Sequence, residues 1–243
     1  MGMLQGEHVA IKVPTGDVRR MSAEIAANSK MLVTNGRPRF FMRALGIASL
    51  DATRQGQNSV RVDALVLESW RYNSGSEQCM PLLQYIQVNA KRRLPHLELL
   101  KLCWCLSGAL EEVHDAKLVQ GDMKLDNAFV CVRQGSSSDE VMDGCLSDLS
   151  HCLDLEERRD KVFQPHHDMP FMPSEVEPFL PSIDVYGLGN IFKALFSWSW
   201  ECVNGPVLCD EGPIRFMITR MLSRYDRRPT SREVHTFFAQ QMG

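Results

Sequence analysis

The chain has 243 residues, 44% of them hydrophobic and 23% charged, a balance that is typical of a folded globular protein and excludes disorder as its main state. Lys and Arg number 27 against 30 Asp and Glu, so the formal charge of −3 provides no basic face for nucleic acid. No apolar run approaches the roughly 20 residues of a membrane span, and the first residues lack the features of a signal peptide. We therefore expect a soluble, monomeric chain without a membrane span.

Eight cysteines are scattered along the sequence and form no C-x-x-C pair. Cys103 and Cys105 stand two apart on a predicted helix, where their side chains point in different directions. Free cysteine is readily buried, so the pattern favours reduced core thiols over disulfides. Origin from a longer secreted precursor would shift this balance toward disulfides.

The first 70 residues are predicted to be rich in strands. Hydrophobic periodicity indicates a strand at 8–13, a helix at 17–33, and strands at 44–52 and 61–68 that are joined by the polar turn RQGQN. Beyond the polar run RYNSGSEQ the character changes to long helices. We predict a small strand-rich lobe at 1–70.

The remaining residues, 71–243, are predicted to form a larger and mainly helical lobe, which makes the fold class α+β. A surface hairpin is predicted around 134–140. Four helices are predicted at 95–116, 183–199, 213–224 and 230–241. One stripe of the first helix is apolar: Leu99, Cys103, Leu106, Leu110 and Val113. The second is apolar on nearly every side, so we expect it to be buried all round.

The densest group of reactive side chains lies in LVQGDMKLDNAFV, where Asp122, Lys124 and Asn127 fall in one turn between a helix and a strand. A second acid, Asp148, follows the next predicted strand. This set suits phosphoryl transfer, because one carboxylate can accept a hydroxyl proton while Lys124 offsets developing negative charge. Asn127 and Asp148 offer the oxygen ligands that Mg²⁺ prefers, and Lys12 on the first strand can bind nucleotide phosphates.

Several motifs, in this order, resemble those of the protein kinase superfamily over nearly the whole chain: VAIK (9–12), GDMKLDN (121–127), PSE (173–175) and SIDVYGLG (182–189). Each motif alone carries little weight, and the ordered set carries the resemblance. It implies a bilobal serine/threonine-type kinase, here with a small, N-terminally reduced strand-rich lobe, that uses ATP and Mg²⁺ on a protein substrate.

The resemblance also assigns roles. Asp122 becomes the catalytic base, with Lys124 beside it, and Asn127 and Asp148 become the metal ligands. Asp184 is expected to brace the catalytic loop. Glu175 is expected to pair with Arg228 of RRPT.

The nucleotide site implied by the resemblance centres on Lys12, with Glu24 as its candidate ion-pair partner. Glu24 on a solvated helix face remains the alternative. In VLESW, Leu67 would be the gatekeeper, and residues Glu68 to Trp70 would offer backbone groups to adenine. Ala10 on one side, and Phe129 or Val130 on the other, are candidates to contact the adenine ring, although each also suits a plain core.

Three departures from the family pattern stand out. The sequence holds no G-x-G-x-x-G, and eight residues precede VAIK, so the chain is either a fragment or a member of a branch without the loop. QGD replaces HRD, so we expect no phosphorylation switch that acts through Gly121. DLS replaces DFG, which keeps Asp148 but places Ser150 where the family has glycine.

A branch without the glycine loop occurs among the apicomplexan secreted kinases of the rhoptry and dense-granule type, and the sequence is similar to it in this respect. That resemblance implies a location in the parasitophorous vacuole, whereas the default expectation is cytoplasmic. His166, His167 and Asp168 cluster in the expected activation segment, where a solvated or substrate-facing loop is favoured over a metal site.

Three functions follow from these patterns. The first is an active but atypical Ser/Thr protein kinase, a transferase that binds ATP weakly. The second is a pseudokinase that acts as a scaffold or allosteric regulator of a partner. The third, a small-molecule phosphotransferase, is disfavoured by the PSE and RRPT motifs.

Overall fold

The computed structural model describes residues 2–4, 7–13, 18–36, 39–42, 44–52, 60–68, 77–89, 94–135, 139–157, 162–164, 171–201 and 212–243. Within them the chain is an α+β structure, in which long helices accompany several small antiparallel sheets. The expected α+β class is therefore confirmed. The predicted lobe boundary at residue 70 lies outside the described residues.

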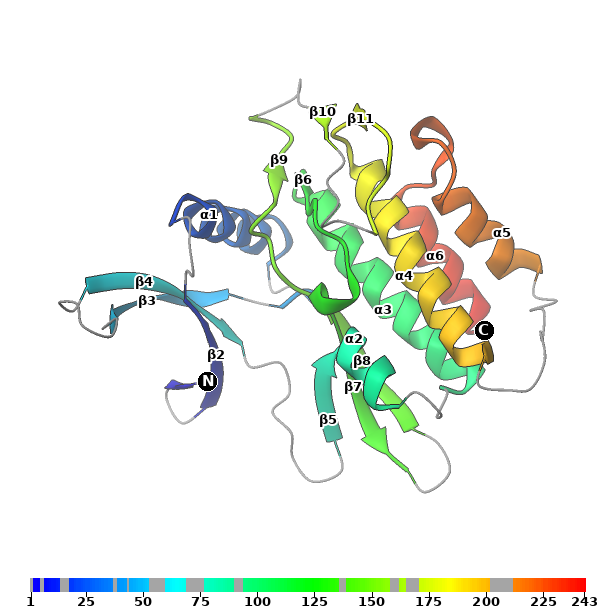
Figure 1. Ribbon diagram of the computed structural model, residues 1–243, viewed down its shortest axis with the longest axis horizontal. Coiled ribbons are helices and arrows are strands. Elements are labelled where there is room, and N and C mark those ends of the chain that lie inside the picture. The colour runs from blue at the N-terminus through cyan, green and yellow to red at the C-terminus, as the bar shows by residue number, and fades with distance from the viewer. Residues whose placement is uncertain are drawn as a thin grey trace.

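The N-terminal part forms a four-stranded antiparallel sheet. Its order is β1 (Gly2–Leu4), β2 (Glu7–Lys12), β4 (Val60–Glu68) and β3 (Ala44–Ala52). The three predicted strands are present, while the short β1 was not predicted because three residues carry no readable alternation. Figure 1 shows this sheet with α1 (Val18–Asn35) at one side of the molecule.

One face of α1 is buried, and that face is partly polar. Its buried residues recur at intervals of three or four: Met21, Glu24, Ala27, Asn28 and Met31. This spacing is the helical period that the sequence indicated. Because Glu24 lies on the inner face, the alternative of a solvated Glu24 is wrong.

Helices form most of the remaining structure, and Figure 1 shows α3, α4 and α6 running alongside one another. In the described part of the chain these α-helices are α2 (Leu82–Val88), α3 (His96–Asp115), α4 (Pro181–Glu201), α5 (Gly212–Met221) and α6 (Ser231–Gln241). The predicted apolar stripe of α3 is fully buried. Over residues 181–199 of α4 only Lys193 is exposed, which confirms the expectation of a buried helix.

The start of α6 shows how local sequence fixes a helix boundary. The Thr230 hydroxyl accepts the backbone N–H of Glu233 at 3.2 Å, and the Glu233 carboxylate accepts the N–H of Thr230 at 2.7 Å. This reciprocal pair satisfies two backbone donors that have no partner inside the helix. Thr230 directly follows Pro229 and is the last residue of the RRPT motif, so the pair also fixes where the chain leaves this motif.

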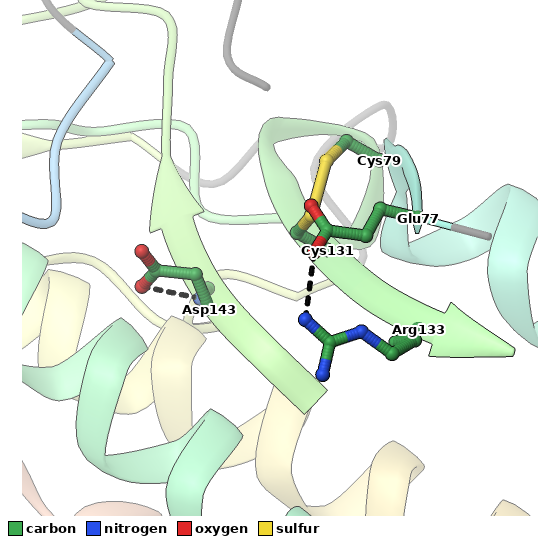
Figure 2. The surroundings of a disulfide bond; sticks show 6 residues. Glu77, Cys79, Cys131, Arg133 and Asp143 are labelled. Carbon is green, nitrogen blue, oxygen red and sulfur yellow. Dashed lines mark hydrogen bonds and ion pairs between the residues drawn. A yellow bond between two sulfur atoms is a disulfide. The ribbon is translucent and has the colours of Figure 1, made fainter. Parts of the chain in front are cut away.

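A three-stranded antiparallel sheet, ordered β5 (Glu77–Pro81), β7 (Ala128–Gln134) and β8 (Asp139–Leu146), contains the predicted hairpin. A disulfide joins Cys79 on β5 to Cys131 on β7, and the Arg133–Glu77 ion pair flanks it at 2.9 Å (Figure 2). The expectation of reduced thiols throughout is therefore wrong. The two cysteines are 52 residues apart in sequence, and only the strand register places them opposite one another.

The other described cysteines fit the expectation of core thiols. Cys103, Cys105 and Cys145 are buried and unbridged, and Cys152 is half-buried. Burial raises the pKa of the Cys105 thiol to about 12, with the nearby Asp143 carboxylate adding to the effect. These thiols therefore stay protonated at neutral pH.

Two short strand pairs place the loops that follow the main elements. β6 (Leu118–Val119) pairs with β9 (Leu153–Asp154), and β10 (Val162–Phe163) pairs with β11 (Glu177–Pro178). The first pair holds the segment after β8 beside the segment after α3. No helix of the described residues is long and apolar enough to cross a membrane.

Candidate functional site

The segment after β6 is held by a buried carboxylate from α4. Asp184 has no exposed surface, and its two oxygens accept the backbone N–H groups of Gln120 at 2.7 Å and Gly121 at 2.9 Å. His114 contacts the same carboxylate at 3.1 Å through Nε2 and the Ser231 hydroxyl at 2.9 Å through Nδ1. Asp184 therefore braces this loop, as expected from the sequence.

Gly121 has a backbone conformation that other residues rarely adopt. Its φ is +76°, and a Cβ added there would approach the backbone oxygen of His151 at 2.9 Å. An arginine at this position would therefore strain the loop. The QGD sequence is thus matched to the local backbone.

Gln120 connects the two acid-bearing segments, a role that sequence reasoning missed. Its side-chain amide donates to the backbone oxygen of Asp148 at 3.0 Å, and its side-chain oxygen accepts the N–H of Asp122 at 3.0 Å. Gln120 precedes Asp122 by two residues and Asp148 by 28, and no local sequence pattern indicated this bridge. It shows that the segments holding Asp122 and Asp148 lie side by side.

Asp122 is surrounded by the two residues that the sequence grouped with it. Lys124 Nζ contacts its carboxylate at 2.5 Å, and the Asn127 amide donates to its backbone oxygen at 2.9 Å and its carboxylate at 3.2 Å. Asn127 lies in the single-turn helix η1 (Leu125–Asn127). Asp122 and Asn127 are buried while Lys124 is half-exposed, so the lysine is the member that reaches solvent.

Asp148 follows β8 in the left-handed region, with a φ of +67°. Its carboxylate accepts the backbone N–H of Ser150 at 2.9 Å and binds Lys12 Nζ at 2.8 Å. The same ammonium lies 2.9 Å from the Glu24 carboxylate, so the predicted Lys12–Glu24 ion pair is present. The consecutive elements β2 and α1 therefore meet the distant segment after β8 at one ammonium group.

The ionic contacts set the protonation behaviour of this cluster. For Asp148, burial acts to raise the pKa, but the hydrogen bonds from Lys12 and Ser150 outweigh it and lower the pKa. Burial dominates at Glu24 and raises its pKa despite Lys12. Burial acts to lower the pKa of Lys12, and its two carboxylate partners reverse that effect and raise it. Lys12 is accordingly a firm cation.

The remaining residues of the predicted nucleotide site lie on β2, β4 and β7. Ala10 stands opposite Leu67 in the β2–β4 register, and Glu68 stands opposite Val9. Ala10, Leu67, Glu68 and Phe129 are half-buried, whereas Val130 is fully buried and belongs to the core. Trp70 lies outside the described residues, as do His166, His167 and Asp168.

The predicted Glu175–Arg228 pair is wrong, because Glu177 takes that role. Arg228 donates to the two carboxylate oxygens of Glu177 at 2.6 and 3.0 Å. Residues 174–176 are exposed, and the chain turns inward only at Glu177 in β11. The alternation of exposed and buried positions at this turn decides which acid meets the arginine, and the PSE motif does not reveal it.

Two further observations concern a cavity elsewhere in the structure and the possible ligands of a metal ion. A cavity of about 500 Å³ between residues 173–177, Tyr186 and residues 222–225 contains none of the predicted catalytic or nucleotide residues. Among the described residues no three His, Cys, Asp or Glu side chains form a group that could hold a metal ion.

Comparison with known proteins adds no relative. No protein-family model and no curated protein matches this chain.

Proposed function

We propose that this chain is an ATP-dependent serine/threonine protein kinase that transfers the γ-phosphoryl group to protein hydroxyls. The observation that carries the proposal is the meeting of Lys12, Glu24 and Asp148 beside Asp122, across the Gln120 bridge. A chain without phosphate chemistry has no physical need to hold these three acids together with Lys12 and Lys124 in this arrangement.

The side chains suit the separate tasks of phosphoryl transfer. Lys12, fixed by Glu24, would bind nucleotide phosphates, and Asp148 and Asn127 would supply oxygen ligands to Mg²⁺. The metal ion, when bound, would neutralise charge on the phosphate oxygens. Asp122 would accept the proton of the substrate hydroxyl, and Lys124, which is half-exposed, would face the transferred group.

The order of the elements supports a kinase-like bilobal fold. A lysine-bearing strand leads to a helix that carries the pairing glutamate, and the Asp122 loop lies between α3 and β7 under the brace of Asp184. Adenine would lie beside Ala10 and Phe129, with the backbone near Leu67 and Glu68 as its hydrogen-bonding edge.

Phosphoryl transfer from labelled ATP to a generic acidic protein, with Mg²⁺, tests the proposal. Asp122→Asn is expected to reduce the rate by about 10²–10⁴-fold, the range for removing a general base, and Asp148→Asn is expected to reduce it by removing an oxygen ligand of Mg²⁺. Asp126→Asn is the matched control, because Asp126 is an exposed acid in the same loop. Equal label incorporation by all four proteins would refute the assignment.

A pseudokinase that regulates a partner is the second candidate, favoured by the QGD and DLS motifs and by the absence of a G-x-G-x-x-G motif from the sequence. Thermal unfolding with and without Mg²⁺ and ATP separates the candidates. A bound nucleotide stabilises the native state by about 1.4 kcal/mol at tenfold saturation. Folded protein with neither stabilisation nor transfer would favour the scaffold.

The Cys79–Cys131 disulfide is relevant to the cellular compartment in which the protein works. Disulfides persist in oxidising surroundings and are rare in the cytosol, so the Cys79–Cys131 bond favours the secreted alternative over the cytoplasmic default. Alkylation of natively isolated protein before any reduction, followed by peptide mass analysis, tests this. Alkylated Cys79 and Cys131 would contradict the secreted location.

A further inference from the structure

Helix α1 is attached at two places to the segment that follows Asp148. At the first place the Glu24 carboxylate accepts the backbone N–H of Leu149, and it shares Lys12 with Asp148. The second place uses Lys30, whose Nζ contacts both oxygens of Asp154 at 2.8 Å and Glu156 at 2.7 Å. No residue of this second contact belongs to a motif recognised in the sequence.

The two attachments are well separated on both elements. Glu24 and Lys30 are six residues apart, about 9 Å along the helix axis. Asp148 and Asp154 are also six residues apart. A single attachment lets a helix rotate about the contact, whereas two attachments fix its direction as well.

Asp154 is itself held firmly by the backbone. It pairs with Leu118 in the β6–β9 ladder, and the N–H of Leu155 donates to the oxygen of Lys117 at 3.0 Å. Its carboxylate also accepts the N–H of Glu156 at 2.9 Å. Since β6 leads directly to Gln120, Lys30 joins α1 to the strand pair from which the Asp122 loop begins.

Glu24 needs such support. It is 2% exposed, and within the described residues the contacts of its charged carboxylate with Lys12 and Leu149 offset the cost of burying the charge. A small rotation of α1 would carry the carboxylate away from both groups. Lys12 would then keep Asp148 as its partner.

We propose that Lys30 is a positioning residue, which clamps α1 onto residues 148–156 and thereby holds Glu24 against Lys12. The effect of this Lys30 clamp on catalysis rests on the proposed kinase function. The clamp itself concerns only this chain's own side chains and is testable without any phosphoryl transfer.

The test measures the rate at which Lys12 is acylated by an amine-reactive reagent, read by mass spectrometry of the peptide. Lys30→Met removes the charge and keeps the aliphatic stem. It is expected to raise the acylation rate of Lys12 by about fivefold, the upper end for a partly exposed ion pair, because an amine that loses its contact with the Glu24 carboxylate is less shielded from the reagent. Lys30→Arg should restore the parent rate.

Lys193→Met is the matched control, since Lys193 is an exposed lysine on helix α4. It should leave Lys12 unaffected. The paired variant Asp154→Asn with Glu156→Gln removes the clamp from the other side and is expected to give the same rise as Lys30→Met. This second variant keeps the test valid if Lys30→Met does not fold. An unchanged acylation rate in a folded clamp variant overturns the proposal.

The same proteins, assayed for phosphoryl transfer, separate the two claims. A parent that transfers no phosphate, but whose Lys12 responds to Lys30→Met, refutes the kinase proposal and supports the clamp. A parent that transfers phosphate, with Lys12 indifferent to Lys30→Met, refutes the clamp alone. If both hold, Lys30→Met lowers kcat about fivefold and Lys30→Arg restores it.

Discussion

The Arg228–Glu177 ion pair and the cluster of Lys12 with Glu24 and Asp148 differ in how far they are exposed to solvent. Arg228 and Glu177 are 3% and 6% exposed, and the guanidinium also donates to the backbone oxygens of Ser223 at 2.8 Å and Ser182 at 3.1 Å. It further lies over the ring of Tyr186 at 4.7 Å. Every one of these partners is fixed, so this pair stabilises the fold.

The Lys12 cluster is more open. The side chains of Lys12 and Asp148 are 33% and 27% exposed, although Glu24 beneath them is buried. A half-exposed ammonium can exchange a carboxylate partner for a phosphate oxygen at small cost, whereas a buried guanidinium cannot. A buried ion pair therefore stabilises the fold, whereas a solvent-exposed ion pair can also bind a ligand.

The strongest test of this comparison is Arg228→Met. Removing one member of a buried pair leaves an uncompensated charge on Glu177, so we expect a loss of about 3–5 kcal/mol in the free energy of unfolding. Urea denaturation measures it. Glu177→Gln should also destabilise the fold, whereas Glu175→Gln, at an exposed position, should change little. A larger loss of stability in Glu175→Gln than in Glu177→Gln would contradict the assignment of Glu177 as the partner of Arg228.

A smaller effect is expected from Lys12→Met. The loss leaves Glu24 and Asp148 without their shared cation, and we expect a loss of about 1–3 kcal/mol at neutral pH. Because burial raises the pKa of Glu24, this carboxyl takes up a proton readily, so the loss should shrink as the pH falls toward 4.5. Urea midpoints at two pH values check this. A loss as large as that of Arg228→Met would contradict the open character of the cluster.

The smallest expected effect is a loss of thermal stability at low pH. The pKa of Asp148 and of Asp154 is lowered, since lysine contacts outweigh burial at each. Such groups bind more protons in the unfolded chain, so their stabilisation is present above their ordinary value of 3.8 and is lost as the pH falls below it. Thermal midpoints of the parent and of Lys30→Met, measured from pH 6 to about pH 3, should converge at the acid end. Parallel curves would show that Lys30 does not contribute to this loss.

Much of the element layout could be predicted from the sequence. The strands at 44–52 and 61–68 and helices α3, α5 and α6 follow from the hydrophobic period, because burial of one face imposes that period on the sequence. Helix α4 is recognised instead by its long run of apolar residues, since it is buried on nearly every side. The strand β5 could not be predicted, since all five of its residues are half-buried and show no alternation. It becomes a strand through its pairing with β7.

The candidate site was predictable where its residues are close in sequence. Asp122, Lys124 and Asn127 fall within one turn, so their convergence needs no knowledge of the fold. The Gln120 bridge and the Lys30 clamp were missed, because each joins segments more than 25 residues apart.

The sequence by itself determined the long helices, the longer strands and the turn that carries the reactive side chains, because these depend on neighbours a few positions away. Only the tertiary structure decided that Cys79 faces Cys131 and that Glu177, not Glu175, meets Arg228. Those contacts depend on strand register and on the direction in which a chain turns inward. Both are set by the packing of elements far apart in sequence, which no local pattern encodes.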